Sequence, residues 1–188
     1  MRIVAGRFGG LRLSAPKSQS IRPTSDRVRE SLFGILQHGL GFACTDRRVL
    51  DLFAGTGALG LEALSRGAAH AVFVENGPQG RSLIRDNIER SGTAGATRVF
   101  RRDATRLGPV GAIPPFDLCF LDPPYERGLG ERALASAAAG GWLAPGAHCV
   151  LEEHRRAEFV LPERFDAVDE RAMGDTVLRF LVYSSAPL

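Results

Sequence analysis

The 188-residue chain lacks several features that would set it apart from ordinary globular proteins. It contains only three cysteines, Cys44, Cys119 and Cys149, whose odd number and spacing argue against a disulfide framework and against a metal site. It has no apolar run long enough to span a membrane, no apparent signal peptide and no internal repeat. These absences predict a cytoplasmic protein that holds no metal and does not act at a membrane.

Lysine is also nearly absent, so arginine carries almost all of the positive charge. The net charge is only +3, which is a weak indication of a nucleic-acid partner. Its distribution is uneven, because residues 1–30 have a net charge of +5 and the remaining residues −2. The basic residues of this segment are Arg2, Arg7, Arg12, Lys17, Arg22, Arg27 and Arg29. Such an arm suits phosphate groups, although arginines in an arginine-rich chain can equally form a solvated face.

Composition and length predict one globular domain with a short N-terminal extension. Hydrophobic residues make up 44% and charged residues 24%, which excludes a disordered chain. We assign residues 1–22 to a basic arm and link, and residues 23–188 to the main domain. Segments 2–8 and 11–14 flank Gly9-Gly10 and predict a β-hairpin. A hairpin of this size is marginal alone and must pack on the domain or on a partner.

A helix is predicted after the arm, capped by Thr24 or Ser25 and continuing to about Gln37. Its apolar face is formed by Val28, Leu32, Ile35 and Leu36, which Phe33 extends. Arg27 and Arg29 are expected to fall mostly away from this face. They could therefore bind a phosphate or the carboxylate of a cofactor, or bind nothing.

The next segment combines a strand, a glycine-rich turn and a helix. An apolar strand from Val49 leads into the turn, and the apolar helix that follows is expected to stop at Gly67. Three glycines of this segment fit the pattern G-x-G-x-x-G, namely Gly55, Gly57 and Gly60. The following strand, 71–75, ends in Glu75, at the spacing of a carboxylate that binds ribose hydroxyls. Glycine-rich turns are common, but this combination predicts a nucleotide-type cofactor site.

Further alternation of helices and strands brings more acidic residues to strand ends. A helix is predicted over Pro78–Ser91, followed by a strand at 97–100 with Asp103 just beyond it. Another apolar strand, 116–121, is followed by Asp122, and Asp51 lies within the first strand. Because ligands bind at the carboxyl ends of strands in an open parallel sheet, these acids are predicted to share one site.

The most specific motif is Asp122-Pro123-Pro124-Tyr125 at the end of the strand 116–121. The prolines fix the backbone and donate no N–H, so the preceding carbonyls can point at a ligand. A planar base bearing an amino group fits here, because the ring can stack on it while the carboxylate and a carbonyl accept its amino hydrogens. Taken alone, the same four residues could be an ordinary turn at a strand end.

The C-terminal third is predicted to complete an α/β sheet. A helix is expected around 129–139 and a strand over 147–152. Two further strands, 166–173 and 176–183, flank Gly174-Asp175, a glycine-first hairpin turn. The result is a mostly parallel sheet that ends in an antiparallel hairpin.

Residues 51–57 followed by 122–125 resemble the S-adenosylmethionine-dependent amino-methyltransferases. Residues 22–33 and the glycine-containing start at 2–6 narrow the resemblance to the RsmD-like family, bacterial enzymes that methylate guanine N2 in small-subunit ribosomal RNA. The resemblance covers nearly the whole chain, although after Leu151 only the pattern matches. It implies a Rossmann-like class I methyltransferase fold with an N-terminal hairpin extension, and a monomer that acts on 16S rRNA in the small subunit or its assembly intermediate.

The resemblance also implies roles for individual residues. The residues that would bind S-adenosylmethionine are Asp51, Phe53, Gly55, Thr56, Gly57, Glu75, Asn76, Asp103 and Ala104. The catalytic residues would be Asp122, Pro123, Pro124 and Tyr125. The basic residues of segment 1–30 would bind RNA, while Arg27 and Arg29 could instead hold the cofactor carboxylate or neither.

Other activities would use these residues differently. An adenine-N6 methyltransferase acting on DNA or RNA shares the amine chemistry and is the main alternative. A protein-glutamine methyltransferase would be expected to carry Asn in place of Asp122, and a cytosine-C5 enzyme needs a cysteine nucleophile, whereas Cys119 lies inside an apolar strand. An NAD-dependent oxidoreductase would leave the proline motif unused, and a non-catalytic RNA-binding module would leave the cofactor residues unused.

Overall fold

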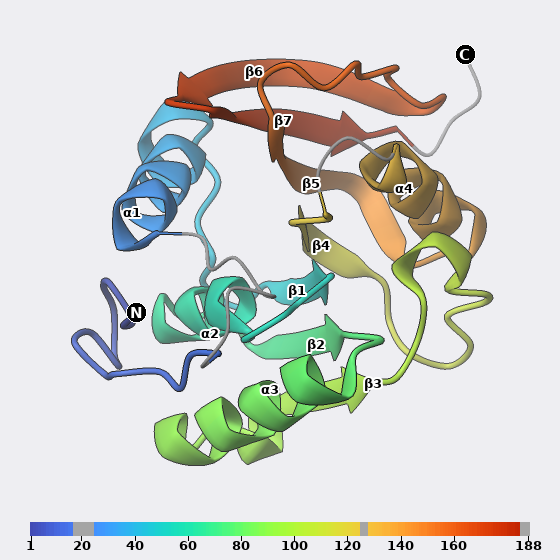
Figure 1. Ribbon diagram of the computed structural model, residues 1–188. Helices are drawn as coiled ribbons and strands as arrows, with labels where there is room; N and C mark the ends of the chain where they lie inside the picture. Colours follow the sequence, from blue (N-terminus) through green and yellow to red (C-terminus); the bar gives the residue numbers. More distant parts are fainter. Residues whose placement is uncertain (17–24, 125–127, 185–188) are drawn as a thin grey trace.

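A twisted seven-stranded sheet forms the centre of the molecule (Figure 1). The computed structural model describes residues 1–16, 25–124 and 128–184. The strand order is β3-β2-β1-β4-β5-β7-β6. The strands are β1 (Arg48–Leu52), β2 (His70–Val74), β3 (Thr97–Phe100), β4 (Phe116–Leu121), β5 (Leu143–His154), β6 (Phe165–Met173) and β7 (Thr176–Tyr183).

The predicted sheet is confirmed. Strands β1 to β5 pair in parallel, while β7 pairs antiparallel with both β5 and β6. Gly174, with φ +64°, makes the turn between β6 and β7. Cys119 and Cys149 face each other in register on β4 and β5 as buried, free thiols.

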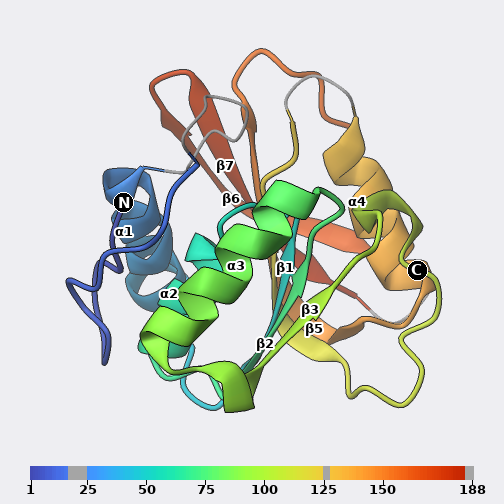
Figure 2. The ribbon, with the colours of Figure 1, turned by 60° about the horizontal axis from the view of Figure 1, so that its bottom comes forward.

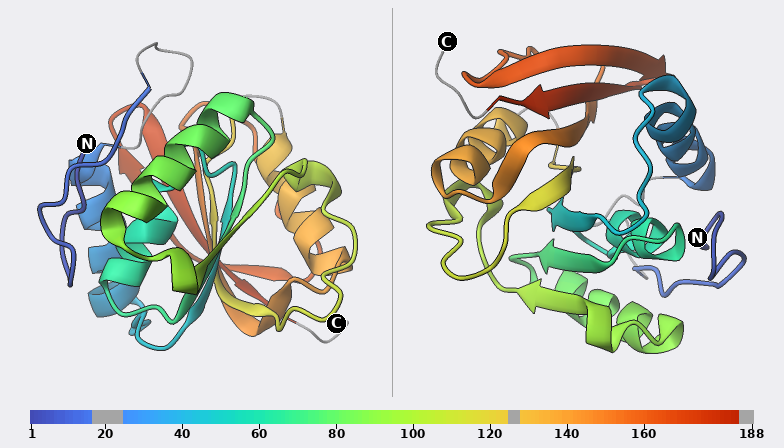
Figure 3. Two further views of the ribbon diagram at one scale, coloured as in Figure 1. Left: turned by 90° about the horizontal axis from the view of Figure 1, so that it is seen from below. Right: turned by 180° about the vertical axis from the view of Figure 1, so that it is seen from behind.

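Helices cover both faces of this sheet (Figures 2 and 3). They are α1 (Asp26–Gly34), α2 (Ala58–Ser65), α3 (Pro78–Ser91) and α4 (Leu129–Ala139), with short helical turns η1 (Ile35–Gly39), η2 (Ala94–Ala96) and η3 (Ala104–Arg106). Helices α1 to α3 lie on one face and α4 on the other. Neighbouring strand residues such as Val49 and Leu50 belong to the two opposite core clusters, as strand geometry requires. Among the described helices, none is both long and apolar enough to cross a membrane.

Proline and glycine mark the element ends that the sequence predicted. Pro78 occupies the first turn of α3, and Gly92 takes a left-handed φ of +65° after its end. At α1 the Ser25 hydroxyl accepts a hydrogen bond from the Val28 N–H at 3.2 Å, so Ser25 is the cap. The helix predicted to run to about Gln37 is confirmed, and its final turn, Ile35–Gly39, is a π-helix.

The N-terminal arm keeps only the base of the predicted hairpin, where the Ile3 N–H donates to the Leu11 carbonyl at 2.9 Å and the Leu13 N–H to the Met1 carbonyl at 3.2 Å, and the rest is a loop. Within residues 1–16, the structure shows a single antiparallel bridge between Arg2 and Arg12, and Gly6 and Gly10 take left-handed φ values near +80° to +90°. The arm runs alongside α2 (Figure 1), and Ile3 is fully buried. A Cβ on Gly6 would lie 2.0 Å from the Ser65 carbonyl oxygen, so only glycine permits this approach.

Two side chains of the main domain hold the arm in place through its backbone. The buried Glu62 carboxylate of α2 accepts hydrogen bonds from the N–H groups of Val4 and Ala5, at 2.7 and 3.0 Å. Asn87 of α3, also fully buried, accepts from the Ser14 N–H at 2.6 Å and donates to the Ser14 carbonyl at 3.2 Å. The arm therefore packs as part of the domain.

The prediction that Arg29 faces away from the apolar side of its helix was wrong. Its side chain is fully buried, donates to the Arg2 carbonyl and pairs with the Asp26 carboxylate at 2.7 Å. It thus lies inside, between α1 and the arm, rather than away from the apolar face. A guanidinium with no exposed surface cannot meet an RNA phosphate, so Arg29 is a structural residue here.

We predict that Glu62→Ala strongly destabilises the protein and loosens the arm. The substitution removes a buried acceptor from two half-buried N–H groups, and we expect the free energy of unfolding to fall by about 3 kcal/mol in urea titrations. Limited trypsin digestion should then cut the arm faster. The control is Glu89→Ala, an exposed site on α3, where the change should stay within about 0.5 kcal/mol. Equal stability of the two variants would contradict this role of Glu62.

Candidate cofactor and active site

The carboxyl ends of the four strands β1 to β4 form one edge of the sheet. Leu52, the last residue of β1, pairs with Val74 at the end of β2 and with Leu121 at the end of β4. Val74 in turn pairs with Phe100 at the end of β3. Because these four strands end level with one another, the residues that follow them leave the sheet at the same edge, as the sequence predicted.

The turn between β1 and α2 has an unusual backbone. Phe53, Gly55 and Gly57 all take positive φ values, +56°, +55° and +76°. Such a value costs a phenylalanine about 1 kcal/mol or more, and residues of this kind collect at ligand-binding sites. A Cβ on Gly60 would lie 2.5 Å from the Phe73 ring, so this glycine lets α2 pack closely on β2.

Glu75 links the end of β2 to this turn. Its Oε2 accepts a hydrogen bond from the Gly55 N–H at 2.9 Å, and its Oε1 accepts from the Gly77 N–H at 2.6 Å. A Cβ on Gly80 would lie 2.7 Å from the Glu75 side chain, so α3 can begin beside the carboxylate only because it has a glycine there. A carboxylate offers about four acceptor positions. The half-buried Glu75 can therefore accept further hydrogen bonds from ligand hydroxyls.

Asp51 lies beneath the turn rather than on its surface. Its side chain is buried, and Oδ2 accepts from the Gly60 N–H at 2.9 Å. Burial raises the pKa of this carboxyl to about 8, the Gly60 hydrogen bond opposes that rise, and the nearby Glu75 carboxylate adds to it. Asp51 thus acts on the start of α2, and any effect on a ligand passes through the turn.

Asp103 and Ala104 follow β3 at the same edge. Asp103 Oδ1 accepts from the Thr105 hydroxyl at 2.7 Å and from its N–H at 2.8 Å, and these bonds hold the pKa of Asp103 below its usual value. Ala104 is buried at the start of η3, which contacts α4 through a hydrogen bond from the Leu107 N–H to Ser136 Oγ at 2.8 Å. The Asp103 carboxylate is therefore ionised, exposed and fixed in position.

Asp122 stands beside the glycine turn. Leu52 of β1 and Leu121 of β4 are register partners. Phe53 and Asp122 directly follow them, and they therefore leave neighbouring strands that lie about 4.8 Å apart. Asp122 is half-buried, Pro123 buried and Pro124 exposed. Tyr125 lies outside the described residues. The structure thus brings the proline motif next to the turn, although the two are about 70 residues apart in sequence.

The basic residues of segment 1–30 lie at the surface in part, with Arg7 beside Ser65 at the end of α2 and Arg27 on α1. Arg2, Arg7, Arg12 and Arg27 are exposed, whereas Lys17 and Arg22 lie outside the described residues. The arm reaches the turn at Thr56, whose hydroxyl contacts the Met1 sulfur at 3.6 Å and whose carbonyl accepts from Asn87 at 2.9 Å. Thr56 is buried and faces the arm.

Sequence reasoning did not identify Glu62 and Asn87, the two side chains that attach the arm. Both carried a signal, because each is a polar residue on an otherwise apolar helix face. Asn87 lies between Ile84 and Ile88 on the buried side of α3, and Glu62 lies in the apolar run of α2. Asn76 is exposed after β2, where its carbonyl accepts from the Arg81 guanidinium.

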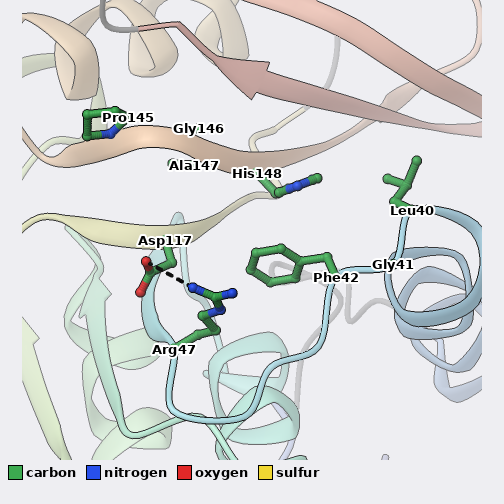
Figure 4. A pocket seen from close by; sticks show the side chains of 9 residues that line it. All are labelled: Leu40, Gly41, Phe42, Arg47, Asp117, Pro145, Gly146, Ala147 and His148. Atoms are coloured by element: carbon green, nitrogen blue, oxygen red, sulfur yellow. Dashed lines mark ion pairs between the residues drawn. The ribbon is translucent and has the colours of Figure 1, made fainter.

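A hollow of about 300 Å³ lies at the opposite edge of the sheet (Figure 4). Arg47 and Asp117 face each other across it at 3.7 Å, and the rings of Phe42 and His148 pack 4.5 Å apart beside them. It lies at the amino ends of β1 and β4, and none of the predicted site residues lines it. In the described part of the chain, no three His, Cys, Asp or Glu side chains are grouped so that they could hold a metal ion.

We predict that Asp51→Asn flattens the dependence of stability on pH. Between the unfolded pKa near 4 and the folded pKa of about 8, the folded protein binds one more proton than the unfolded chain. Its free energy of unfolding should therefore fall as pH rises, by up to about 1.4 kcal/mol per pH unit. Asparagine cannot ionise, so urea titrations of the variant should lack this decline. Parallel profiles for the two proteins would contradict a raised pKa.

Comparison with known proteins gives close relatives along nearly the whole chain. Ribosomal RNA small subunit methyltransferase D of Escherichia coli is 37% identical over 183 residues, which cover 95% of this chain and 88% of that protein. The enzyme of the same name from Haemophilus influenzae is 32% identical over 176 residues, covering 93% and 89%.

Solved structures show the same relationship. That of Escherichia coli yhhF aligns with a TM-score of 0.83 and 32% identity over 99% of both chains. An RNA methyltransferase from Salinibacter ruber, solved with S-adenosyl-L-homocysteine, shares the fold with a TM-score of 0.66 at 15% identity, over 87% of this chain and 95% of that one. These neighbours confirm the class I methyltransferase fold. Residues 1–182 match the model of the family described as conserved hypothetical protein 95, and the chain belongs to this RsmD family.

Proposed function

We propose that the protein transfers a methyl group from S-adenosylmethionine to the exocyclic N2 amine of one guanine in 16S ribosomal RNA. The observation that carries this proposal is the position of Asp122-Pro123 directly beside the glycine turn, on the paired strands β4 and β1. A cofactor at the turn and a base at the proline motif would then be in contact. The names of the relatives support ribosomal RNA of the small subunit as the substrate class.

The residues at the edge fit this cofactor. The left-handed turn at Phe53–Gly57 allows close approach of its methionine part, and the half-buried Glu75 can accept from its two ribose hydroxyls. In this proposal Asp103 and the Ala104 N–H bind the adenine, together with Asn76 after β2. When bound, the cofactor supplies an electrophilic methyl group on a cationic sulfonium. The carboxylates at this edge favour such a cation.

Asp122 and Pro123 act on the nucleophile. The N2 lone pair of guanine is delocalised into the ring, so the amine attacks poorly without help. Hydrogen bonds from N2 to the Asp122 carboxylate and the Pro123 carbonyl favour a pyramidal nitrogen with a localised lone pair. Tyr125 would stack on the base and align it for in-line attack.

The electron balance requires no strong base. The N2–carbon bond forms as the carbon–sulfur bond breaks, and the electron pair stays on sulfur as a neutral thioether. The alkylated nitrogen is acidic and then loses its proton to solvent. Most of the acceleration therefore comes from positioning and from the fixed acceptors at Asp122 and Pro123.

The arm and the start of α1 supply the RNA contacts in this proposal. Arg2, Arg7, Arg12 and Arg27 present exposed guanidinium groups, and Lys17 and Arg22 would extend the same basic segment. We treat residues 1–22 as the RNA-binding extension of a domain formed by residues 23–188. A segment with so few basic groups contacts few phosphates, so we propose that a monomer recognises the small subunit or an assembly intermediate in the cytoplasm, where folded RNA adds specificity.

The decisive experiment uses methyl-labelled S-adenosylmethionine and small subunits from cells lacking this enzyme. We expect label in N2-methylguanosine, identified by mass spectrometry of the digested RNA. Asp122→Ala should lower turnover by at least about 100-fold, as loss of a fixed hydrogen-bonding partner does, while cofactor affinity remains nearly unchanged. Asp86→Ala, an exposed carboxylate on α3, is the control and should be fully active.

Each other outcome has a clear meaning. Label in N6-methyladenosine would keep the amine chemistry and replace guanine by adenine as the substrate. Cofactor binding without any labelled RNA would overturn the RNA assignment. An Asp122→Ala variant with near-normal turnover would remove Asp122 from the catalytic role.

Glu75→Ala should show the opposite pattern to Asp122→Ala. The substitution removes the ribose acceptor and releases the Gly55 N–H, so calorimetry should show S-adenosylmethionine binding weakened by about 10- to 100-fold. Glu89→Ala serves as the matched control, since this glutamate is exposed on α3. Unchanged affinity in Glu75→Ala would place the ribose elsewhere.

A further inference from the structure

The loop between β5 and β6, residues 155–164, carries two large apolar side chains that the core does not use. Val160 is 77% exposed and Leu161 is 41% exposed. In contrast, the neighbouring Phe159 packs against the core cluster on the α4 face, and its ring lies 4.8 Å from the Arg179 guanidinium. Val160 and Leu161 therefore form an apolar tip that points away from the domain.

The start of this loop and the Phe159 contact place the tip level with the candidate-site edge, because Arg179 pairs with Leu151 and Leu151 pairs with Leu121. Strand β5 runs parallel to β4, and Leu151 of β5 pairs with Leu121, the last residue of β4. Strand β5 then continues for three more residues to His154, or about 10 Å at 3.3 Å per residue. The loop thus begins beyond the edge from which Asp122 leaves. In Figure 2 it rises in orange at the top, between the β6–β7 hairpin and α4.

The tip is also held in position. The Val160 N–H donates to Glu131 Oε1 at 3.4 Å, and Glu131 belongs to the first turn of α4. This helix begins only a few residues after the proline motif, so the loop is anchored to the element that follows Asp122 and Pro123. An apolar tip fixed beside a polar site can enter a partner without first having to be ordered.

The charges around the tip indicate what kind of partner it meets. Arg155 and Arg156 at the start of the loop are exposed, whereas Arg164 at its end lies beside Tyr183 at the opposite edge of the sheet. Guanidinium groups suit phosphates, and small apolar side chains between such contacts are used by nucleic-acid-binding proteins to enter a base stack. A strand of RNA therefore fits this surface.

We propose that Val160 and Leu161 form a wedge that enters the RNA base stack beside the target guanine and keeps that base turned out toward Asp122. This inference rests on the proposed function. An enzyme that modifies a base amine must take the base out of its stack or find it already unpaired, and the gap left behind favours an apolar filler. Val160 and Leu161 would be positioning residues, because they act on the neighbouring stack and not on the reacting atoms.

The test compares single-turnover methylation of small subunits by the wild type and by the double variant Val160→Ser/Leu161→Ser. The rate at saturating subunit should fall at least about tenfold, equivalent to about 1.4 kcal/mol, while S-adenosylmethionine affinity by calorimetry stays unchanged. Val168→Ser is the matched control, since Val168 is 44% exposed on β6, and it should retain the full rate. The conservative variant Val160→Leu/Leu161→Met keeps the apolar tip and should restore most of the rate.

Two results would overturn the wedge. A double serine variant as fast as the wild type would show that the tip does not act on the RNA. A slow conservative variant would show that these positions need particular shapes for some other contact, such as a ribosomal protein. Both results leave the methyltransferase assignment intact, since that assignment fails only if the wild type itself labels no RNA.

Discussion

The left-handed turn between β1 and α2 is the constraint on which the rest of the structure depends. Three residues in five, Phe53, Gly55 and Gly57, take positive φ values. Two carboxylates hold the turn from opposite sides, Glu75 through the Gly55 N–H and Asp51 through the Gly60 N–H. The turn can therefore present its backbone to a ligand without having to form on binding. The raised pKa of Asp51 is the consequence of burying one of these carboxylates.

The arm is joined to the same turn, although its sequence describes a separate basic extension. Asn87 contacts Ser14 of the arm and the Thr56 carbonyl of the turn at once, and Glu62 on the helix that follows the turn holds Val4 and Ala5. The RNA contacts proposed for the arm and the cofactor contacts proposed for the turn thus depend on the same two helices. The buried Arg29, between the arm and α1, serves this attachment.

Strand length shapes the other side of the site. Strands β1 to β4 end level with one another, whereas β5 continues beyond them and raises the loop that carries Val160. At its amino end β5 begins at Leu143, four residues before the predicted start at residue 147. Phe116 pairs with Leu143 but Leu118 pairs with His148, so residues 144–147 bulge opposite Asp117 and border the hollow at the far edge. One long, irregular strand therefore borders features at both edges of the sheet.

The sequence by itself determined the local elements and the position of the acids at strand ends. Helix α3 begins at Pro78 and ends before Gly92, and β4 covers the apolar run 116–121, because these limits follow from proline, glycine and hydrophobic periodicity within a few residues. Level strand ends then follow from parallel pairing, which is why Glu75, Asp103 and Asp122 were correctly expected at one edge.

Only the tertiary structure decided which polar groups are buried and what they hold. Arg29, Glu62 and Asn87 are charged or polar residues whose burial depends on an arm far away in sequence, and Asp51 lies under the turn because α2 packs over it. The arm pairs with itself only around the Arg2–Arg12 bridge, and the N–H groups of Val4, Ala5 and Ser14 bond instead to Glu62 and Asn87. Local patterns carry no record of such long-range hydrogen bonds, so packing alone settles them.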